Sequence, residues 1–224
     1  MKRIFSAGAL ILFAGIAHAA DPIGSSKTPQ QVADLYMSTM MGNADDAKAL
    51  NDYLRPEYEG KDAFEVKSIA GMMDNMTKQV AVAMKNELGA SDDATNDAIP
   101  GFAQAAVDAI KRSACHSTGA TVKPNEYKEG DFIAEGEYEC HVPDLKKALA
   151  PQIASSDGKV TAAGLTAMTT TINATPADKI LNGKFALYSS AQHLWETGSP
   201  DEVLDAVIDD VMAVIDDTMS GAKK

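Results

Sequence analysis

The stretch DFIAEGEYECHV, residues 131–142, decides the fold class of this chain. Phe132, Ala134, Tyr138, Cys140 and Val142 alternate there with a second set of residues: Ile133, Glu135, Glu137, Glu139 and His141. A period of two is typical of an antiparallel strand that has one face on the core and the other in water. Its nearest candidate partner is CHSTGATVK, residues 115–123, joined to it by a loop over 124–130. The sequence therefore predicts a β-hairpin.

The predicted hairpin carries the two cysteines of the chain, Cys115 and Cys140. An even pair in an oxidising compartment is most simply a disulfide, whose loop closure contributes roughly 3 kcal/mol. If the cysteines are cross-strand partners, His116 stands opposite Glu139, with His141 diagonal to it. Cysteines and histidines then point to opposite faces and cannot share one zinc ion. We predict a disulfide, and an ordinary His–Glu pairing in preference to a metal site.

Helical spacing of apolar residues covers most of the chain before the hairpin. The first helix has a capping box at Thr28-Pro29-Gln30-Gln31, with proline in the first turn. The segment SDDATND reads as a polar loop. Helices are predicted over residues 29–41, from Asn43 to Leu54, from Ile69 to Leu88 and over 100–113.

The chain after the hairpin leaves more alternatives open. A short helix is expected from Pro143-Asp144 to about Pro151. Residues 159–175 fit helix by their Ala, Leu and Met, but strand by their Val and Thr. Asn182-Gly183 is a candidate hairpin turn, and a helix start at Thr175-Pro176 is the alternative. No linker or repeat divides the chain.

The final helix is predicted from Pro200 to about Met219, after a second capping box that begins at Ser199. Its repeated AVIDD places apolar residues on one side and acidic residues on the other. A helix points carboxylates outward in parallel, whereas a calcium site needs oxygens that converge, so no metal is expected there. The acidic residues are Glu202, Asp205, Asp209, Asp210, Asp216 and Asp217.

These carboxylates have two interpretations. A solvated helix face is the simpler one. However, solvated faces usually mix both signs, and no Lys or Arg lies between Pro200 and Met219. A docking face for a cationic protein partner is the functional interpretation.

The first 19 residues predict a secretory signal peptide. Lys2 and Arg3 precede an apolar run, and Ala17-His18-Ala19 fits a cleavage site. Residues 20–224 are then expected to form a single soluble exported domain in the periplasm, without stable membrane insertion. With two basic residues in the leader, 18 of the 20 Lys and Arg remain against 32 Asp and Glu, a formal charge of −14. That charge disfavours binding to nucleic acid.

Together the segments predict an α+β fold, predominantly helical, whose helices pack on a small antiparallel sheet held by one disulfide. The chain lacks the common catalytic and phosphate-binding motifs, so we expect neither an enzyme nor a cofactor. The leading interpretation is a non-catalytic acidic binding protein of the inhibitor or immunity type, directed at a cationic cell-wall hydrolase or toxin.

Two other function classes stay open. A hydrolase would use His193 and Glu196 of SSAQHLWE, which meet if that stretch is helical. A small-ligand or copper(I) carrier would use methionine thioethers, although helical core packing produces the same spacing. The candidate copper ligands are Met37, Met40, Met73 and Met76.

Overall fold

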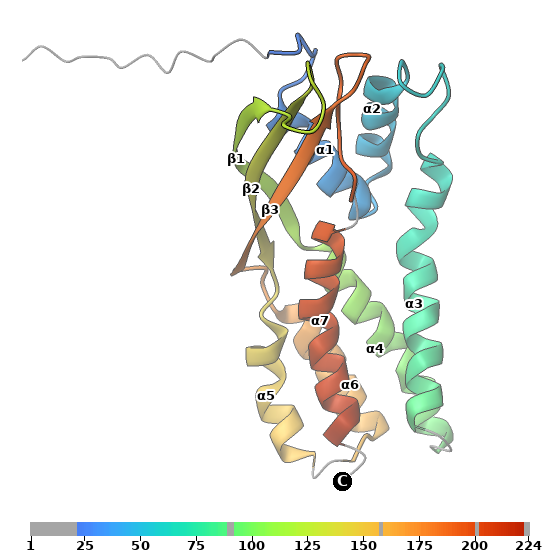
Figure 1. Ribbon diagram of the computed structural model, residues 1–224. Helices are drawn as coiled ribbons and strands as arrows, with labels where there is room; N and C mark the ends of the chain where they lie inside the picture. Colours follow the sequence, from blue (N-terminus) through green and yellow to red (C-terminus); the bar gives the residue numbers. More distant parts are fainter. Residues whose placement is uncertain (1–21, 89–91, 157–158, 200–201, 222–224) are drawn as a thin grey trace, which may run out of the picture.

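The computed structural model describes residues 22–88, 92–156, 159–199 and 202–221. In these ranges seven helices pack on one four-stranded antiparallel sheet (Figure 1), which confirms the α+β, predominantly helical fold class. The predicted signal peptide lies outside the described residues. The helices are α1 (Pro29–Met40), α2 (Ala44–Leu54), α3 (Val66–Leu88), α4 (Asp93–Lys111), α5 (Leu145–Ser155), α6 (Ala162–Ala174) and α7 (Glu202–Gly221), and the strands are β1 (Ala114–Pro124), β2 (Phe132–Val142), β3 (Lys179–Ser189) and β4 (Trp195–Glu196).

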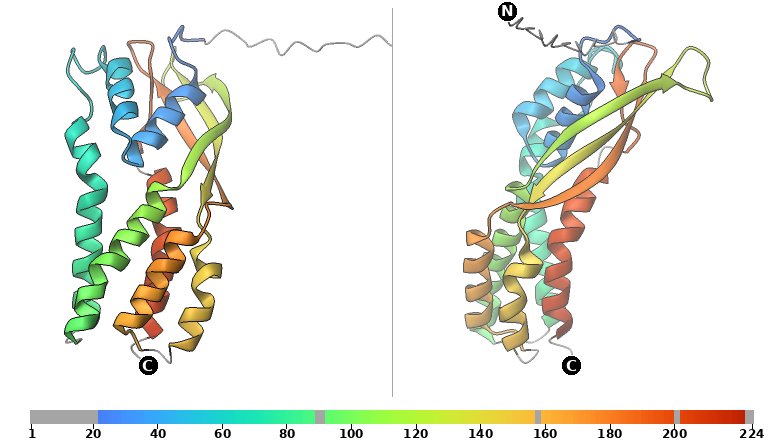
Figure 2. Two further views of the ribbon diagram at one scale, coloured as in Figure 1. Left: turned by 180° about the vertical axis from the view of Figure 1, so that it is seen from behind. Right: turned by 90° about the vertical axis from the view of Figure 1, so that its left-hand side faces the viewer.

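The sheet and the short helices α1 and α2 occupy one end of the molecule, and α4, α5, α6 and α7 occupy the other (Figure 1). Helix α3 runs along one side. Figure 2 shows the same division from behind and from the side, with α1 and α2 on one face of the sheet. The other face of the sheet is therefore open to solvent along most of its length.

The predicted hairpin and its disulfide are confirmed. Strands β1 and β2 pair in antiparallel register with Cys115 directly opposite Cys140, and the two cysteines are bonded. Along β2 the inward residues Ala134, Tyr138, Cys140 and Val142 are buried, as the alternation predicts. Strand β3 pairs with the other edge of β2, and the two-residue β4 completes the order β1-β2-β3-β4.

The Asn182-Gly183 pair lies in the middle of β3, so the predicted hairpin turn was wrong. Gly183 pairs with Tyr138, and a Cβ atom at Gly183 would lie 2.3 Å from the Tyr138 ring. Gly136 of β2 pairs in the same way with Phe185, whose ring would lie 2.2 Å from an added Cβ. Each glycine thus makes room for the aromatic ring of its cross-strand partner, a role distinct from that of a turn residue.

The ambiguous segment 159–175 contains helix α6. Its N-cap is Thr161, whose hydroxyl accepts the Gly164 N–H at 3.1 Å. Inside the helix the threonine hydroxyls donate to carbonyl oxygens four residues earlier, for example Thr169 to Leu165 O at 2.8 Å. Such bonds satisfy the hydroxyls without leaving the helix, and Leu165, Met168 and Ile172 fix it to the core.

Helices α4 and α5 extend beyond their predicted bounds. Helix α4 begins at Asp93 and not at Pro100, since Asp92 caps it by accepting the Thr95 N–H at 2.7 Å. Ile99, in the first half of α4, is fully buried. Helix α5 likewise continues through Pro151. Both prolines are exposed, so each costs a backbone hydrogen bond without disturbing the core.

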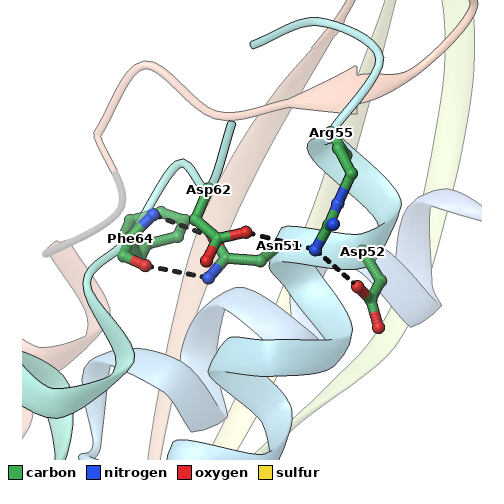
Figure 3. Close-up of polar contacts among 5 residues, drawn as sticks. All are labelled: Asn51, Asp52, Arg55, Asp62 and Phe64. Carbon is green, nitrogen blue, oxygen red and sulfur yellow. Dashed lines mark hydrogen bonds and ion pairs between the residues drawn. The ribbon is translucent and has the colours of Figure 1, made fainter. Parts of the chain in front are cut away.

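A buried asparagine fixes the connection between α2 and α3 (Figure 3). Asn51 is 1% exposed, and its amide donates to Phe64 O and accepts from Phe64 N–H, both at 2.8 Å. At the surface Arg55 forms ion pairs with Asp52 and Asp62 at 2.9 and 3.1 Å. The loop is therefore held by two buried hydrogen bonds to Asn51 and by solvent-exposed ion pairs of Arg55.

Candidate functional site

Helix α7 is amphipathic, as its sequence predicts. It packs against α4 and α5, and Figure 1 shows it in front of α4. Of the predicted apolar residues, Met219 lies outside the described side chains. Val203 and Val214 are also buried. The remaining predicted residues are buried or half-buried: Leu204, Val207, Ile208, Val211, Met212 and Ile215.

Four carboxylates form an exposed row on the opposite side of α7: Glu202, Asp205, Asp209 and Asp216. We call this row the acidic stripe. Residues 202 to 216 span about 21 Å of helix. No Lys or Arg in the described part of the chain forms an ion pair with any of the four. The side chain of Asp217 lies outside the described part.

Asp210, predicted to belong to the same docking face, has a different environment. Its carboxylate forms an ion pair with Lys179 at the start of β3. The two side chains are 20% and 31% exposed, respectively. A partner would have to break this internal pair to use Asp210, so Asp210 joins α7 to the sheet and is not part of the acidic stripe.

The solvent face of the sheet carries both signs of charge, unlike the acidic stripe. Lys123 and Glu135 form a cross-strand ion pair at 2.7 Å, and Glu137 lies opposite Lys184. A cavity of about 960 Å³ is lined by residues of β1, β2 and β3, among them Glu135, Glu137 and Lys184, and by Glu202 of α7. The acidic stripe therefore begins next to the sheet and continues along α7 away from it.

The histidine arrangement follows the predicted register. His116 lies opposite Glu139, and its ring stacks on His141 with centroids 6.4 Å apart. His141 Nε2 is 2.9 Å from Glu139 Oε1. No group of three Cys, His, Asp or Glu side chains in the described residues is placed to hold a metal ion. His116, Glu139 and His141 thus form a polar cluster on the solvent-facing side of the disulfide-linked strands β1 and β2.

The SSAQHLWE segment is not helical. Residues 190–194 form a tight loop, in which Ser190 N–H donates to Leu194 O at 2.8 Å and His193 has a φ of +58°. Glu196 belongs to β4, beyond this loop. The helical proximity on which the hydrolase interpretation depends is therefore missing.

Glu196 instead belongs to a cluster that the sequence analysis missed. Burial, followed by the negative charge of Glu57, raises the pKa of Glu196 above its usual value. Burial and then Glu196 raise the pKa of Tyr36, and burial, Glu196 and Glu57 raise that of Tyr58. Glu57 Oε2 is buried and finds no hydrogen-bond partner among the residues described. The negative charge of Glu57 thus disfavours ionisation of Glu196 and Tyr58, and the negative charge of Glu196 disfavours ionisation of Tyr36 and Tyr58.

Long-range contacts assemble this tyrosine–glutamate cluster. Tyr36 of α1 meets the ring of Phe64 edge-on, with centroids 6.2 Å apart. Tyr53 of α2 accepts the Trp195 N–H at 2.6 Å, which fixes β4 beside the helices. No sequence signal could reveal the cluster, because Glu57 and Glu196 lie on separate elements far apart in the chain.

None of the helices in the described ranges has the length and apolar character needed to cross a bilayer. No protein-family model, curated protein or solved structure matches the chain.

Proposed function

We propose that this chain is an exported, non-catalytic binding protein of the inhibitor or immunity type, which engages a cationic protein such as a cell-wall hydrolase or toxin. The acidic stripe is the contact surface in this proposal. The observation that carries it is the row of four exposed carboxylates, none of which is ion-paired with a Lys or Arg in the ranges that the structure describes.

The acidic stripe carries an electrostatic cost in the free protein. Asp205 and Asp209 are like charges one turn apart, which is unfavourable by roughly 0.3 kcal/mol. Asp216 lies near the negative end of the helix dipole, at a similar cost. Lys or Arg side chains of a partner would relieve both repulsions. Long-range attraction would also speed the encounter, with a rate that falls as salt screens it.

The structure also supports rigid presentation of the acidic stripe. Val207 and Val211 are fully buried on the opposite side of α7, and the Lys179–Asp210 pair ties the helix to β3. A preformed helix loses little conformational entropy on binding, so more of the electrostatic gain appears as affinity.

The test uses the whole exported chain, immobilised and exposed to a cell-envelope extract at low salt. We expect capture of a basic protein that rising salt releases and whose enzymatic activity the chain inhibits. The variant Asp205→Lys/Asp209→Lys should lose at least about tenfold in affinity, because it places cations against a cationic surface.

The matched control is Asp97→Lys/Glu126→Lys, which makes the same change of charge at exposed positions outside α7. It should keep most of the affinity. Failure to capture any basic protein contradicts the proposal. Equal losses in both variants also contradict it, because they show that net charge acts without a localised surface.

A further inference from the structure

A methionine-lined cavity lies between α1, α3 and the start of β1, apart from the acidic stripe. Its volume is about 510 Å³. Met37 and Met41 line it from α1 and its C-cap, and Met73 lines it from α3. Cys115 of the disulfide and Lys111 of α4 also border it. Three methionines, from α1, its C-cap and α3, therefore border one cavity.

Backbone geometry brings these three residues together. Met37 and Met41 lie one helical turn apart, since the Met41 N–H donates to Met37 O at 3.1 Å. The next residue, Gly42, has a φ of +91°, a conformation that favours glycine. A Cβ atom at Gly42 would lie 3.2 Å from Met73 Cγ, so the missing side chain leaves the space that Met73 occupies beside Met41.

Two of the three methionines are shielded from water, and the charge of Lys111 at the border of the cavity is offset by carboxylates. Met37 and Met73 are only 3% and 2% exposed. The ammonium of Lys111 lies 3.8 Å from an Asp74 oxygen and 3.7 Å from an Asp108 oxygen, so these carboxylates offset its positive charge. A monovalent cation held by neutral ligands would thus meet little repulsion.

We propose that Met37, Met41 and Met73 bind one Cu(I) ion in this cavity. Thioethers are soft, neutral ligands that suit Cu(I), and hard divalent cations prefer oxygen. Because thioethers do not titrate, their binding of Cu(I) would persist at acidic pH, where histidine and thiolate sites lose metal to protons.

The structure revises the ligand set that helical spacing suggests. Met40 and Met76 do not line this cavity, and Met40 is buried in the core at 8% exposure. Met41 takes their place because it lies at the turn where α1 ends and α3 passes close by. The Cu(I) site uses a different surface from the acidic stripe, so either proposal can fail without the other.

The experiment is a competition between the exported chain and the chromophoric Cu(I) chelator bicinchoninate, with ascorbate to keep copper reduced. We expect the wild type to withdraw one equivalent of Cu(I) from the chelator. Met37→Leu, Met41→Leu and Met73→Leu should each weaken binding by at least about tenfold, and the triple variant should withdraw none. Leu nearly matches Met in volume, so the fold should persist.

The control is Met84→Leu, a buried methionine of α3 outside the cavity, which should bind as the wild type does. X-ray absorption of the Cu(I)-loaded chain should show sulfur ligands only. No withdrawal of copper by the wild type overturns the proposal. So does a nitrogen or oxygen ligand shell, or full binding by a folded triple variant.

Discussion

Lys179 at the start of β3 forms an ion pair with Asp210 in the middle of α7. This contact separates Asp210 from the acidic stripe, whose members form no ion pair with a Lys or Arg of the described residues. It also links α7 to β3. The same residue type therefore has a structural role at Asp210 and a proposed recognition role at Asp209, one position earlier.

Removing Lys179 should destabilise the protein. In Lys179→Met the Asp210 carboxylate stays mostly buried without its cation, and we expect a loss of about 1–2 kcal/mol, less than for a fully buried pair because both side chains are partly exposed. Urea unfolding measures the change. Asp209→Asn, at an exposed position, should stay within about 0.5 kcal/mol. Equal effects in the two variants would show that the ion pair contributes nothing.

Gly183→Ala should destabilise the sheet by about 1–3 kcal/mol, because the new methyl would overlap the Tyr138 ring. Thermal and urea unfolding report the loss. The control is Gly71→Ala in α3, where an added Cβ meets no atom within 4 Å. That change should stabilise the helix by roughly 0.5–1 kcal/mol. A neutral Gly183→Ala would show that the Tyr138 ring can leave the glycine at no cost.

Stability should depend on pH through Glu196. Burial and Glu57 raise the pKa of Glu196 above 4.5, the value for the unfolded chain. Between the unfolded-state and folded-state pKa values, the folded protein keeps a proton that the unfolded chain has released. The free energy of unfolding therefore falls as pH rises from 4.5 through the folded-state pKa. Glu196→Gln has no such loss, so its stability relative to wild type should rise as the pH increases from 4.5 through the folded-state pKa of Glu196.

Glu57→Gln is the matched variant for the pH experiment. It removes the second cause of the raised Glu196 pKa, so the pH dependence should shrink without disappearing. An unchanged profile in both variants would assign the pH dependence to other groups. Urea titrations at a series of pH values provide the comparison.

Loss of the disulfide should lower the free energy of unfolding by roughly 3 kcal/mol, as loop closure over the 25-residue separation of Cys115 and Cys140 implies. The comparison is between the wild type and Cys115→Ala/Cys140→Ala under oxidising conditions. A reductant should destabilise the wild type alone. If both respond alike, the reductant acts elsewhere on the protein.

Local patterns predicted the features that depend on a few neighbouring residues. The capping box at Thr28 starts α1 as expected, and its hydroxyl accepts the Gln31 N–H. Alternation along β2 predicted its buried face and, with the cysteines, the register of the hairpin. These features depend on backbone periodicity and on hydrogen bonds within one helical turn or between two neighbouring strands.

Where distant contacts compete with local propensity, the sequence interpretation was wrong or open. Pro151 reads as a helix end, yet α5 continues past it at an exposed position. Gly183 reads as a turn residue, yet the Tyr138 ring requires it inside a strand. The composition of segment 159–175 does not decide between helix and strand, and burial of Leu165 in the core stabilises the helix.

By itself, the sequence determined the fold class, the disulfide and the acidic face of the last helix, because periodicity and composition encode them directly. Only the tertiary structure decided that Lys179 removes Asp210 from that face, that Glu57 and Glu196 share a site, and that Met41 joins Met37 and Met73. Each of these pairings joins elements distant in the chain. Their proximity comes from how whole elements pack, and no local pattern records it.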